Sequence, residues 1–337
     1  MPSNFLDPAI LFFVFGVFAG LVKSNLEVPQ PIAKFLSLYL LMALGLKGGF
    51  ALSESTVGVH VVLSITLALV LAFLIPVVGY WLLKRFTNSF DAAAMAASYG
   101  SVSAVTFVTA SQFVESAGHT VGGHMAVAMV LMETPAVLVA VFLANALRHS
   151  VRQPAAVASV SAGGAATLGG GPVTPGFGKV LKDSFTDGAH LLLLGALAVG
   201  LISGSAGKAM MHTFSADLFK GMLAFFLLDM GLNVARHLGT AVKASPVLLA
   251  YAVLAPLVHA LLALLLSVLC SLPVGDAALL MILSASASYI VVPAVVRQAI
   301  PEANPGLYLG LSLGVTFPFN ILIGIPLYTE LANLALS

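Results

Sequence analysis

Long apolar segments, separated by short polar stretches, dominate the hydrophobic pattern of this chain. A sliding window of about 19 residues finds ten of them. They cover residues 8–22, 31–52, 57–83, 90–113, 123–147, 186–206, 215–237, 246–270, 275–299 and 305–333. None alternates between apolar and polar positions, as the strands of a membrane barrel do, so helices are predicted throughout. We therefore expect an all-α polytopic membrane protein with ten transmembrane helices.

The ten segments fall into two halves of five. The first half is predicted at 1–147, and the second at 186–337. Between them lies a Gly- and Pro-rich stretch, 148–185, whose composition predicts a flexible linker. Ser101–Ser103 is matched by Ser286–Ser288 at an offset of 185 (286 − 101), and other short motifs recur at similar offsets. Because each half has an odd number of spans, the second enters the membrane upside down, which predicts an inverted repeat.

The charge distribution predicts how the protein sits in the membrane. Only 8% of the residues are charged, whereas a soluble domain carries roughly a quarter. A net charge of +1, without basic stripes, also argues against nucleic-acid binding. Placing the linker in the cytoplasm puts eleven Lys and Arg residues on the inner side and three elsewhere. The positive-inside rule thus predicts a multi-pass membrane protein, surrounded by lipid, with both termini outside.

Two clusters of small hydroxyl residues interrupt the fourth and ninth apolar segments. Ser101, Ser103 and Thr106 lie in the fourth segment, and Ser286 and Ser288 lie in the ninth. Ser288 precedes Pro293 by five residues. Proline kinks a helix about one turn earlier. We therefore predict that helices 4 and 9 are broken and that the freed amides, together with the hydroxyls and with Tyr289, bind a small anion.

Ionisable residues inside apolar segments are costly and therefore indicate function. Glu133 lies in the fifth segment, while Asp229 and Asn233 lie in the seventh. These oxygen-bearing side chains suit a hard monovalent cation, sodium or a proton. Lys47, in the second segment, can either balance a carboxylate or attract an anion.

Five motifs resemble those of a known family, the sodium-dependent bicarbonate transporters. They are Tyr99–Thr106, Met132–Ala136, Met230–Gly231, Ala255–His259 and Ile300–Gly310. The resemblance runs over essentially the whole chain. It implies ten helices in two inverted repeats, a homotrimer, sodium-coupled uptake of bicarbonate across the inner membrane, and inhibition by a small PII-like cytoplasmic protein.

The chain also departs from the pattern of that family. Val105 and Val291 stand where the family has serines, and Tyr289 stands where it has an aspartate. Glu133 replaces an aspartate and keeps the charge, while Ser101 replaces a smaller residue. These changes concern the expected substrate and sodium sites.

The function predicted from the sequence is a secondary active symporter of sodium and bicarbonate, or of a similar small monoanion, working by alternating access. Two alternatives remain open at this stage. One is a proton-coupled or uncoupled carrier of a small organic acid, and the other is a non-transporting membrane sensor that binds a ligand. No nucleophile, base and orienting group come together in the sequence, so an enzyme with a catalytic residue or a cofactor is the weakest interpretation.

Overall fold

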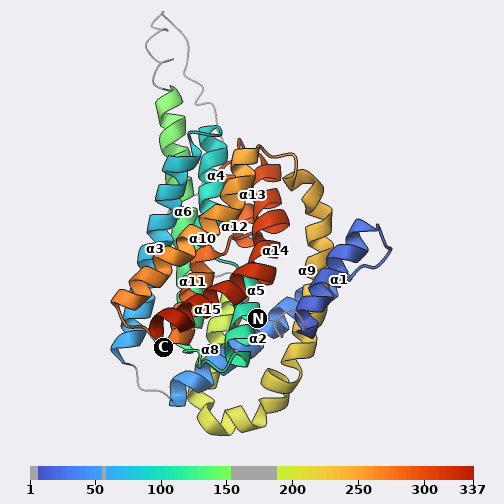
Figure 1. The fold of residues 1–337 in the computed structure, drawn as a ribbon, viewed down its shortest axis with the longest axis vertical. Helices are drawn as coiled ribbons and strands as arrows, with labels where there is room; N and C mark the ends of the chain where they lie inside the picture. The colour runs from blue at the N-terminus through green and yellow to red at the C-terminus, as the bar shows by residue number, and fades with distance from the viewer. Residues whose placement is uncertain (1–6, 55–57, 153–187) are drawn as a thin grey trace, which may run out of the picture.

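The structure, a computed structural model, describes residues 7–54, 58–152 and 188–337, and all the regular elements in these ranges are helices (Figure 1). The first half contains α1 (Pro8–Leu21), α2 (Gln30–Glu54), α3 (Val59–Leu83), α4 (Ser89–Gly100), α5 (Ala104–Ser116) and α6 (His124–Arg152). The second half contains α8 (Gly188–Met210), η3 (Thr213–Asp217), α9 (Phe219–Ala241), α10 (Pro246–Leu269), α11 (Val274–Ala285), α12 (Val291–Ala299), α13 (Pro305–Leu311), η4 (Ser312–Thr316), α14 (Phe317–Phe319), η5 (Asn320–Gly324) and α15 (Ile325–Leu336). The three η elements are π-helical turns.

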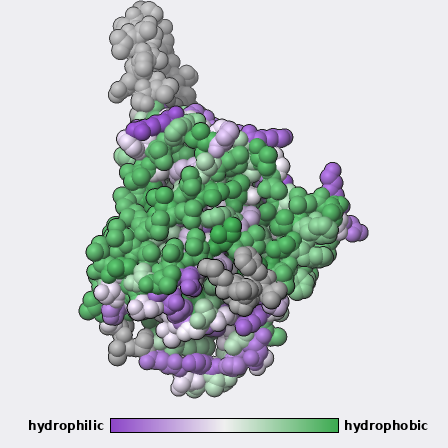
Figure 2. All heavy atoms as spheres, in the orientation of Figure 1, coloured by the Kyte–Doolittle hydropathy of each residue, from purple (hydrophilic) through white to green (hydrophobic). Residues whose placement is uncertain are grey.

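The helices have the length and surface of a membrane protein. Within the described residues, eight helical stretches are long and apolar enough to cross a bilayer. On the face that Figure 2 shows, apolar residues cover the middle of the molecule and many hydrophilic residues lie towards its upper and lower ends. α1 and α11 are shorter, with 14 and 12 residues. The predicted number of ten spans is reached only if α1 counts as one further span and α11 together with α12 as another.

The predicted linker begins later than expected. Residues 148–152 continue α6 as a helix, because no glycine or proline interrupts the chain before Pro154. The remainder of the linker prediction, from 153 onwards, lies outside the described residues. We call the end of the molecule at which α6 finishes the linker end.

The helices assemble into two groups, each drawn from both halves of the chain. In the first, the scaffold group, α1 packs along α9 and α2 packs along α8. Figure 1 shows α1 and α9 side by side at one edge of the molecule. In the second, the core group, α3 packs on α4 and α6, while α10 and α15 pack on α11. Both halves therefore contribute their first two helices to the scaffold and the rest to the core.

Glycines allow the scaffold helices to approach closely. A Cβ atom on Gly49 of α2 would lie 2.2 Å from the carbonyl oxygen of Leu197 in α8. A Cβ atom on Gly231 of α9 would lie 2.3 Å from the carbonyl oxygen of Phe13 in α1. Small residues at such positions permit the van der Waals packing that joins helices in a membrane, where the hydrophobic effect contributes little. The two scaffold pairs are thus closely fitted.

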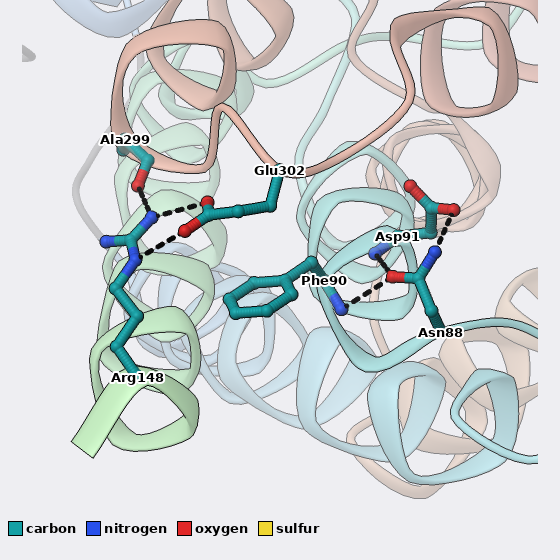
Figure 3. A network of polar contacts seen from close by, with 6 residues as sticks. All are labelled: Asn88, Phe90, Asp91, Arg148, Ala299 and Glu302. Atoms are coloured by element: carbon teal, nitrogen blue, oxygen red, sulfur yellow. Dashed lines mark hydrogen bonds and ion pairs between the residues drawn. The ribbon is translucent and has the colours of Figure 1, made fainter. Parts of the chain in front are cut away.

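Polar contacts hold the core group together at the linker end (Figure 3). The guanidinium of Arg148 in α6 donates to both carboxylate oxygens of Glu302, at 2.8 and 2.7 Å, and to the carbonyl oxygen of Ala299 at 2.8 Å. Nearby, the Asp91 carboxylate in α4 accepts a 2.6 Å hydrogen bond from the backbone N–H of Asn304. The loop between α12 and α13 is therefore anchored to both α6 and α4.

We expect Gly231→Ala to destabilise the protein, because the new methyl group would push α1 away from α9. Overpacking of this kind costs about 1–3 kcal/mol. Gly221→Ala is the matched control on the same helix, since a Cβ atom there meets nothing within 4 Å. Thermal unfolding of the purified proteins measures the difference, and equal melting temperatures for the two variants would contradict the packing argument.

Stability should also fall in acid through Glu302, which lies outside the apolar helices. Hydrogen bonding to Arg148 lowers the pKa of the Glu302 carboxyl. Its contribution is therefore complete above the unfolded-state pKa of about 4.3 and is lost as the pH falls through the lower folded-state value. As the pH is lowered from about 6 to about 3, the melting temperature should drop less in Glu302→Gln than in the wild type. Parallel curves would show that the pair contributes nothing.

Candidate functional site

Two of the predicted spans are each divided into two half-helices. α4 ends at Gly100 and α5 begins at Ala104, so the first break covers 101–103. α11 ends at Ala285 and α12 begins at Val291, so the second break covers 286–290. Ser101, Ser103 and Ser286 have extended backbone angles, which no helix accommodates. The breaks lie at the hydroxyl clusters where the sequence predicts them.

The two breaks lie in direct contact, although 185 residues separate them (286 − 101). The backbone N–H of Ser288 donates to the carbonyl oxygen of Ser98 at 2.7 Å. In return, the backbone N–H of Ser103 donates to the Oγ of Ser286 at 3.1 Å. Backbone groups freed from a helix must find partners within the protein, because lipid offers none. Each break therefore satisfies part of the other.

Serine hydroxyls at both breaks accept hydrogen bonds from the first turn of the following half-helix. The Oγ of Ser103 accepts from the backbone N–H of Thr106 at 3.2 Å, as the N-cap of α5. Serine is a favoured N-cap residue because its hydroxyl satisfies an otherwise unpaired amide. The Oγ of Ser288 accepts from the backbone N–H of Val292 in α12 at 3.3 Å, although the N-cap of that helix is Ile290. Both serines thus satisfy an amide at the start of a half-helix, from different positions.

Two further polar residues, which the sequence analysis missed, support the breaks from the last helical stretch. The amide of Asn320 donates to the carbonyl oxygen of Ala285, the last residue of α11, at 2.8 Å. Thr316 is hydrogen-bonded to the hydroxyl of Tyr99 at 2.8 Å and donates to the carbonyl oxygen of Ala252 at 2.7 Å. Both lie in or beside π-helical turns, which are frequent at functional sites. The sequence contains a signal for both residues, because polar side chains inside an apolar span indicate function.

A cavity of about 90 Å³ lies where the two breaks meet the scaffold group. Its walls come from α2, α5, α6, α8, α9 and both breaks. The lining residues are Ser37, Leu40, Leu41, Val102, Ser103, Ala104, Val105, Val108, Met129, Glu133, Ala189, Leu193, Phe226, Ser288, Tyr289, Ile290 and Val291. Because one water molecule occupies about 30 Å³ of liquid, the cavity has room for a few water-sized groups. Ser37, on α2, is a lining residue that the sequence analysis did not single out.

Glu133 gives this cavity its ionisable character. It is the one Asp, Glu, Lys or Arg residue among the lining residues, and its side chain is buried. The hydroxyl of Tyr289 is also buried, and the Tyr289 ring packs edge-on against Phe317, 5.1 Å away. The rest of the wall is mostly aliphatic. The site therefore combines one carboxyl group, a few hydroxyls and two helix N-termini in an apolar surround.

Of the six predicted anion-binding residues, three line the cavity and three support it. Ser103, Ser288 and Tyr289 belong to the lining. Ser101 donates to the backbone carbonyl of Glu133 at 3.4 Å, and Ser286 donates to the carbonyl oxygen of Leu283 at 2.7 Å. Thr106 lies buried behind the cap of α5. These last three residues hold the backbone of the breaks rather than form the wall.

Only one of the three predicted cation-binding residues lines the cavity. Glu133 lines the cavity, whereas Asp229 and Asn233 do not. The amide of Asn233 instead donates to the carboxylate of Asp229, one turn away on α9, at 3.2 Å. Among the residues that the structure describes, no three His, Cys, Asp or Glu side chains gather as a metal-binding group. Any cation in the cavity would therefore be held by Glu133 with hydroxyl and carbonyl oxygens.

A buried cavity between interrupted apolar helices belongs to a multi-pass membrane protein, and the helices described above fit that class. Comparison with known families agrees with this. The chain belongs to the Na⁺-dependent bicarbonate transporter superfamily, whose family model matches residues 8–333. Comparison with individually curated proteins gave no match. The resemblance noted in the sequence motifs is thus confirmed at the level of the family.

We expect Ser103→Ala to lower the free energy of unfolding by about 1 kcal/mol, because it removes the N-cap of α5. We expect a loss of about 1 kcal/mol in Ser288→Ala as well, because it removes the hydrogen bond to the backbone N–H of Val292. Ser203→Ala is the control. Its hydroxyl donates to the carbonyl oxygen of Val199 within α8, an ordinary intrahelical contact outside the breaks. Denaturant titration of the purified proteins measures all three, and a loss in Ser203→Ala as large as the others would contradict the roles assigned to the two serines.

Proposed function

We propose that the protein is a sodium-coupled symporter of bicarbonate or of a similar small monoanion. The observation that carries the proposal is the cavity itself, in which two helix breaks from different halves of the chain meet one buried carboxylate. Membership of the family supports sodium and bicarbonate as the cargo. In this proposal Ser103, Ser288 and Tyr289 contact the anion, and Glu133 holds the cation.

The helix termini favour an anion in this cavity. The first residues of α5, the last residues of the second break and the first residue of α12 are part of its wall. A helix N-terminus carries roughly half a positive elementary charge, so two of them attract a monoanion. Serine and tyrosine hydroxyls add donors that can rotate towards it. An anion with several oxygen atoms would use these donors together.

Glu133 supplies the physical reason for coupling. Two like charges about 4 Å apart repel each other by about 4 kcal/mol at an effective dielectric constant of about 20. An anion beside an ionised Glu133 would therefore bind poorly. A sodium ion bound at the carboxylate removes this penalty, so the anion and the cation bind best together. The sequence also predicts that Asp229 and Asn233 help to hold the cation, and these two residues are hydrogen-bonded to each other.

The position of the cavity supports transport by alternating access. Its wall is shared between the scaffold group, through α2, α8 and α9, and the core group, through α5, α6 and the breaks. A shift of the core against the scaffold would carry the site from one side of the membrane to the other. We place this motion in two inverted repeats of five spans, with the 148–185 linker in the cytoplasm and both termini outside the inner membrane.

The assembly proposed with this function follows from the family resemblance. It is a homotrimer surrounded by membrane lipid, and a PII-like cytoplasmic protein regulates it from the linker side. The proposed halves, 1–147 and 186–337, fold together as one transport unit, since both contribute helices to each group.

A second candidate is a proton-coupled carrier of a small organic acid. Tyr289 lies where related transporters carry an aspartate, so the lining has one carboxyl group, and much of the wall is aliphatic. Protonation of Glu133 would then remove its charge in place of sodium. Competition among anions for binding distinguishes the two, since displacement by a short carboxylic acid but not by bicarbonate would favour the carrier of organic acids. Binding without any flux would instead indicate a sensor.

Uptake of labelled bicarbonate into proteoliposomes tests the first proposal. We expect uptake to require an inward sodium gradient, and Glu133→Gln to abolish that dependence because the cation loses its carboxylate. Glu330→Gln is the control, since Glu330 is an exposed acid on α15. Equal uptake with sodium and with potassium in the wild type would refute sodium coupling, and wild-type sodium dependence in Glu133→Gln would remove Glu133 from the cation site.

A further inference from the structure

At the end opposite the linker end, an ion pair joins the scaffold group to the core group. The ammonium of Lys47, on α2, lies 2.7 Å from a carboxylate oxygen of Glu115, in the last turn of α5. The same ammonium lies 5.0 Å from the centre of the Phe219 ring on α9. Since α2 and α9 both belong to the scaffold, Lys47 has one partner in its own group and one across the boundary.

Beside this pair, the backbones of α2 and of the α5–α6 loop are in close contact. Gly48, the neighbour of Lys47, packs on Gly123 of the α5–α6 loop so closely that a Cβ atom on Gly123 would lie 1.9 Å from the carbonyl oxygen of Gly48. These residues line a hollow of about 50 Å³. Ser111, on α5, lines the hollow and is buried, and its hydroxyl has no hydrogen-bond partner among the described residues.

Other ion pairs between described residues stay within one group. Lys208 and Glu54, 2.9 Å apart, join α8 to α2 inside the scaffold. Arg148 and Glu302, 2.7 Å apart, lie inside the core, as does the contact of His124 with Asp276. A shift of the core against the scaffold would leave these pairs intact, whereas it would separate Lys47 from Glu115.

We propose that Lys47 and Glu115 form a gate that closes the transport route at the end opposite the linker. The inference rests on the proposed function, because it assumes that the two groups shift. In the state seen here the Lys47–Glu115 pair is formed and Ser111, which lines the hollow, is buried. When the core moves, the pair separates, Gly123 leaves Gly48, and the hollow opens into an entrance. Lys47 stays against Phe219 and presents its positive charge to the incoming anion.

The strength of the pair suits a gate. Both side chains are partly exposed, at 25% for Lys47 and 35% for Glu115. Ion pairs of this kind shift an equilibrium by about two- to fivefold and weaken in salt. Such an interaction biases the closed state without holding it permanently, so the gate can open in every transport cycle.

Thiol labelling at position 111 tests the gate without any substrate. The natural cysteine, Cys270, is first replaced by alanine, and Ser111→Cys then places a small thiol in the hollow. The purified full chain in nanodiscs is treated with a charged methanethiosulfonate reagent, which reaches both faces. We expect slow labelling of Ser111→Cys alone, and labelling about two- to fivefold faster after Lys47→Gln or Glu115→Gln.

The controls separate the gate from a general loosening of the fold. Combining Lys47→Gln with Glu115→Gln should label no faster than either single variant, because the two act through one interaction. Lys208→Gln, which breaks a pair within the scaffold, should leave the rate unchanged. Higher salt should speed labelling of the parent but not of the Lys47→Gln/Glu115→Gln protein. Reversing the pair, with Lys47→Glu and Glu115→Lys together, should restore slow labelling.

Labelling rates that are the same in every variant, or that rise equally with Lys208→Gln, would overturn the gate. The readout also keeps the two proposals distinct. Faster labelling after Lys47→Gln, in a protein that shows no sodium-dependent bicarbonate uptake, would refute the proposed cargo and leave the gate standing. Normal uptake with unchanged labelling would refute the gate alone.

Discussion

Unpaired backbone at membrane depth is the constraint on which the rest of this structure depends. An amide or carbonyl group without a partner in an apolar medium costs several kcal/mol, and each helix break exposes a few of them. The protein meets this cost by placing the two breaks against each other, so that Ser288 donates to Ser98 and Ser103 donates to Ser286. Each break therefore takes part of its hydrogen bonding from the other half of the chain.

The same contacts are compatible with the proposed movement of the core against the scaffold. The breaks and their supports, Thr316 and Asn320, all lie in the core, so a rigid shift of that group would preserve their hydrogen bonds. In the scaffold, close glycine contacts join α1 to α9 and α2 to α8. The boundary between the groups has the cavity on it and the Lys47–Glu115 pair across it. The proposed movement would take place along this boundary.

The sequence predicted the spans and the breaks well, because both follow from local rules. Apolar length identifies a membrane helix, and a proline after clustered serines indicates an interruption. The sequence did not indicate which of the polar residues line the cavity and which support the backbone of the breaks. Ser101 and Ser103 are two residues apart, yet only Ser103 lines the cavity, because the direction of a side chain in an irregular break depends on tertiary packing. Asp229 was grouped with Glu133 by residue type, and nothing local revealed that α9 directs it elsewhere.

The small volume and aliphatic wall of the cavity have a consequence for selectivity. An ion entering this space leaves most of its hydration shell behind, because the wall has room for few accompanying waters. Selectivity between ions then depends on two free energies: the cost of dehydrating each ion, and the gain from its interaction with the fixed dipoles of the site. Divalent anions, which hold water most strongly, would be rejected before any contact with the protein distinguishes their shape.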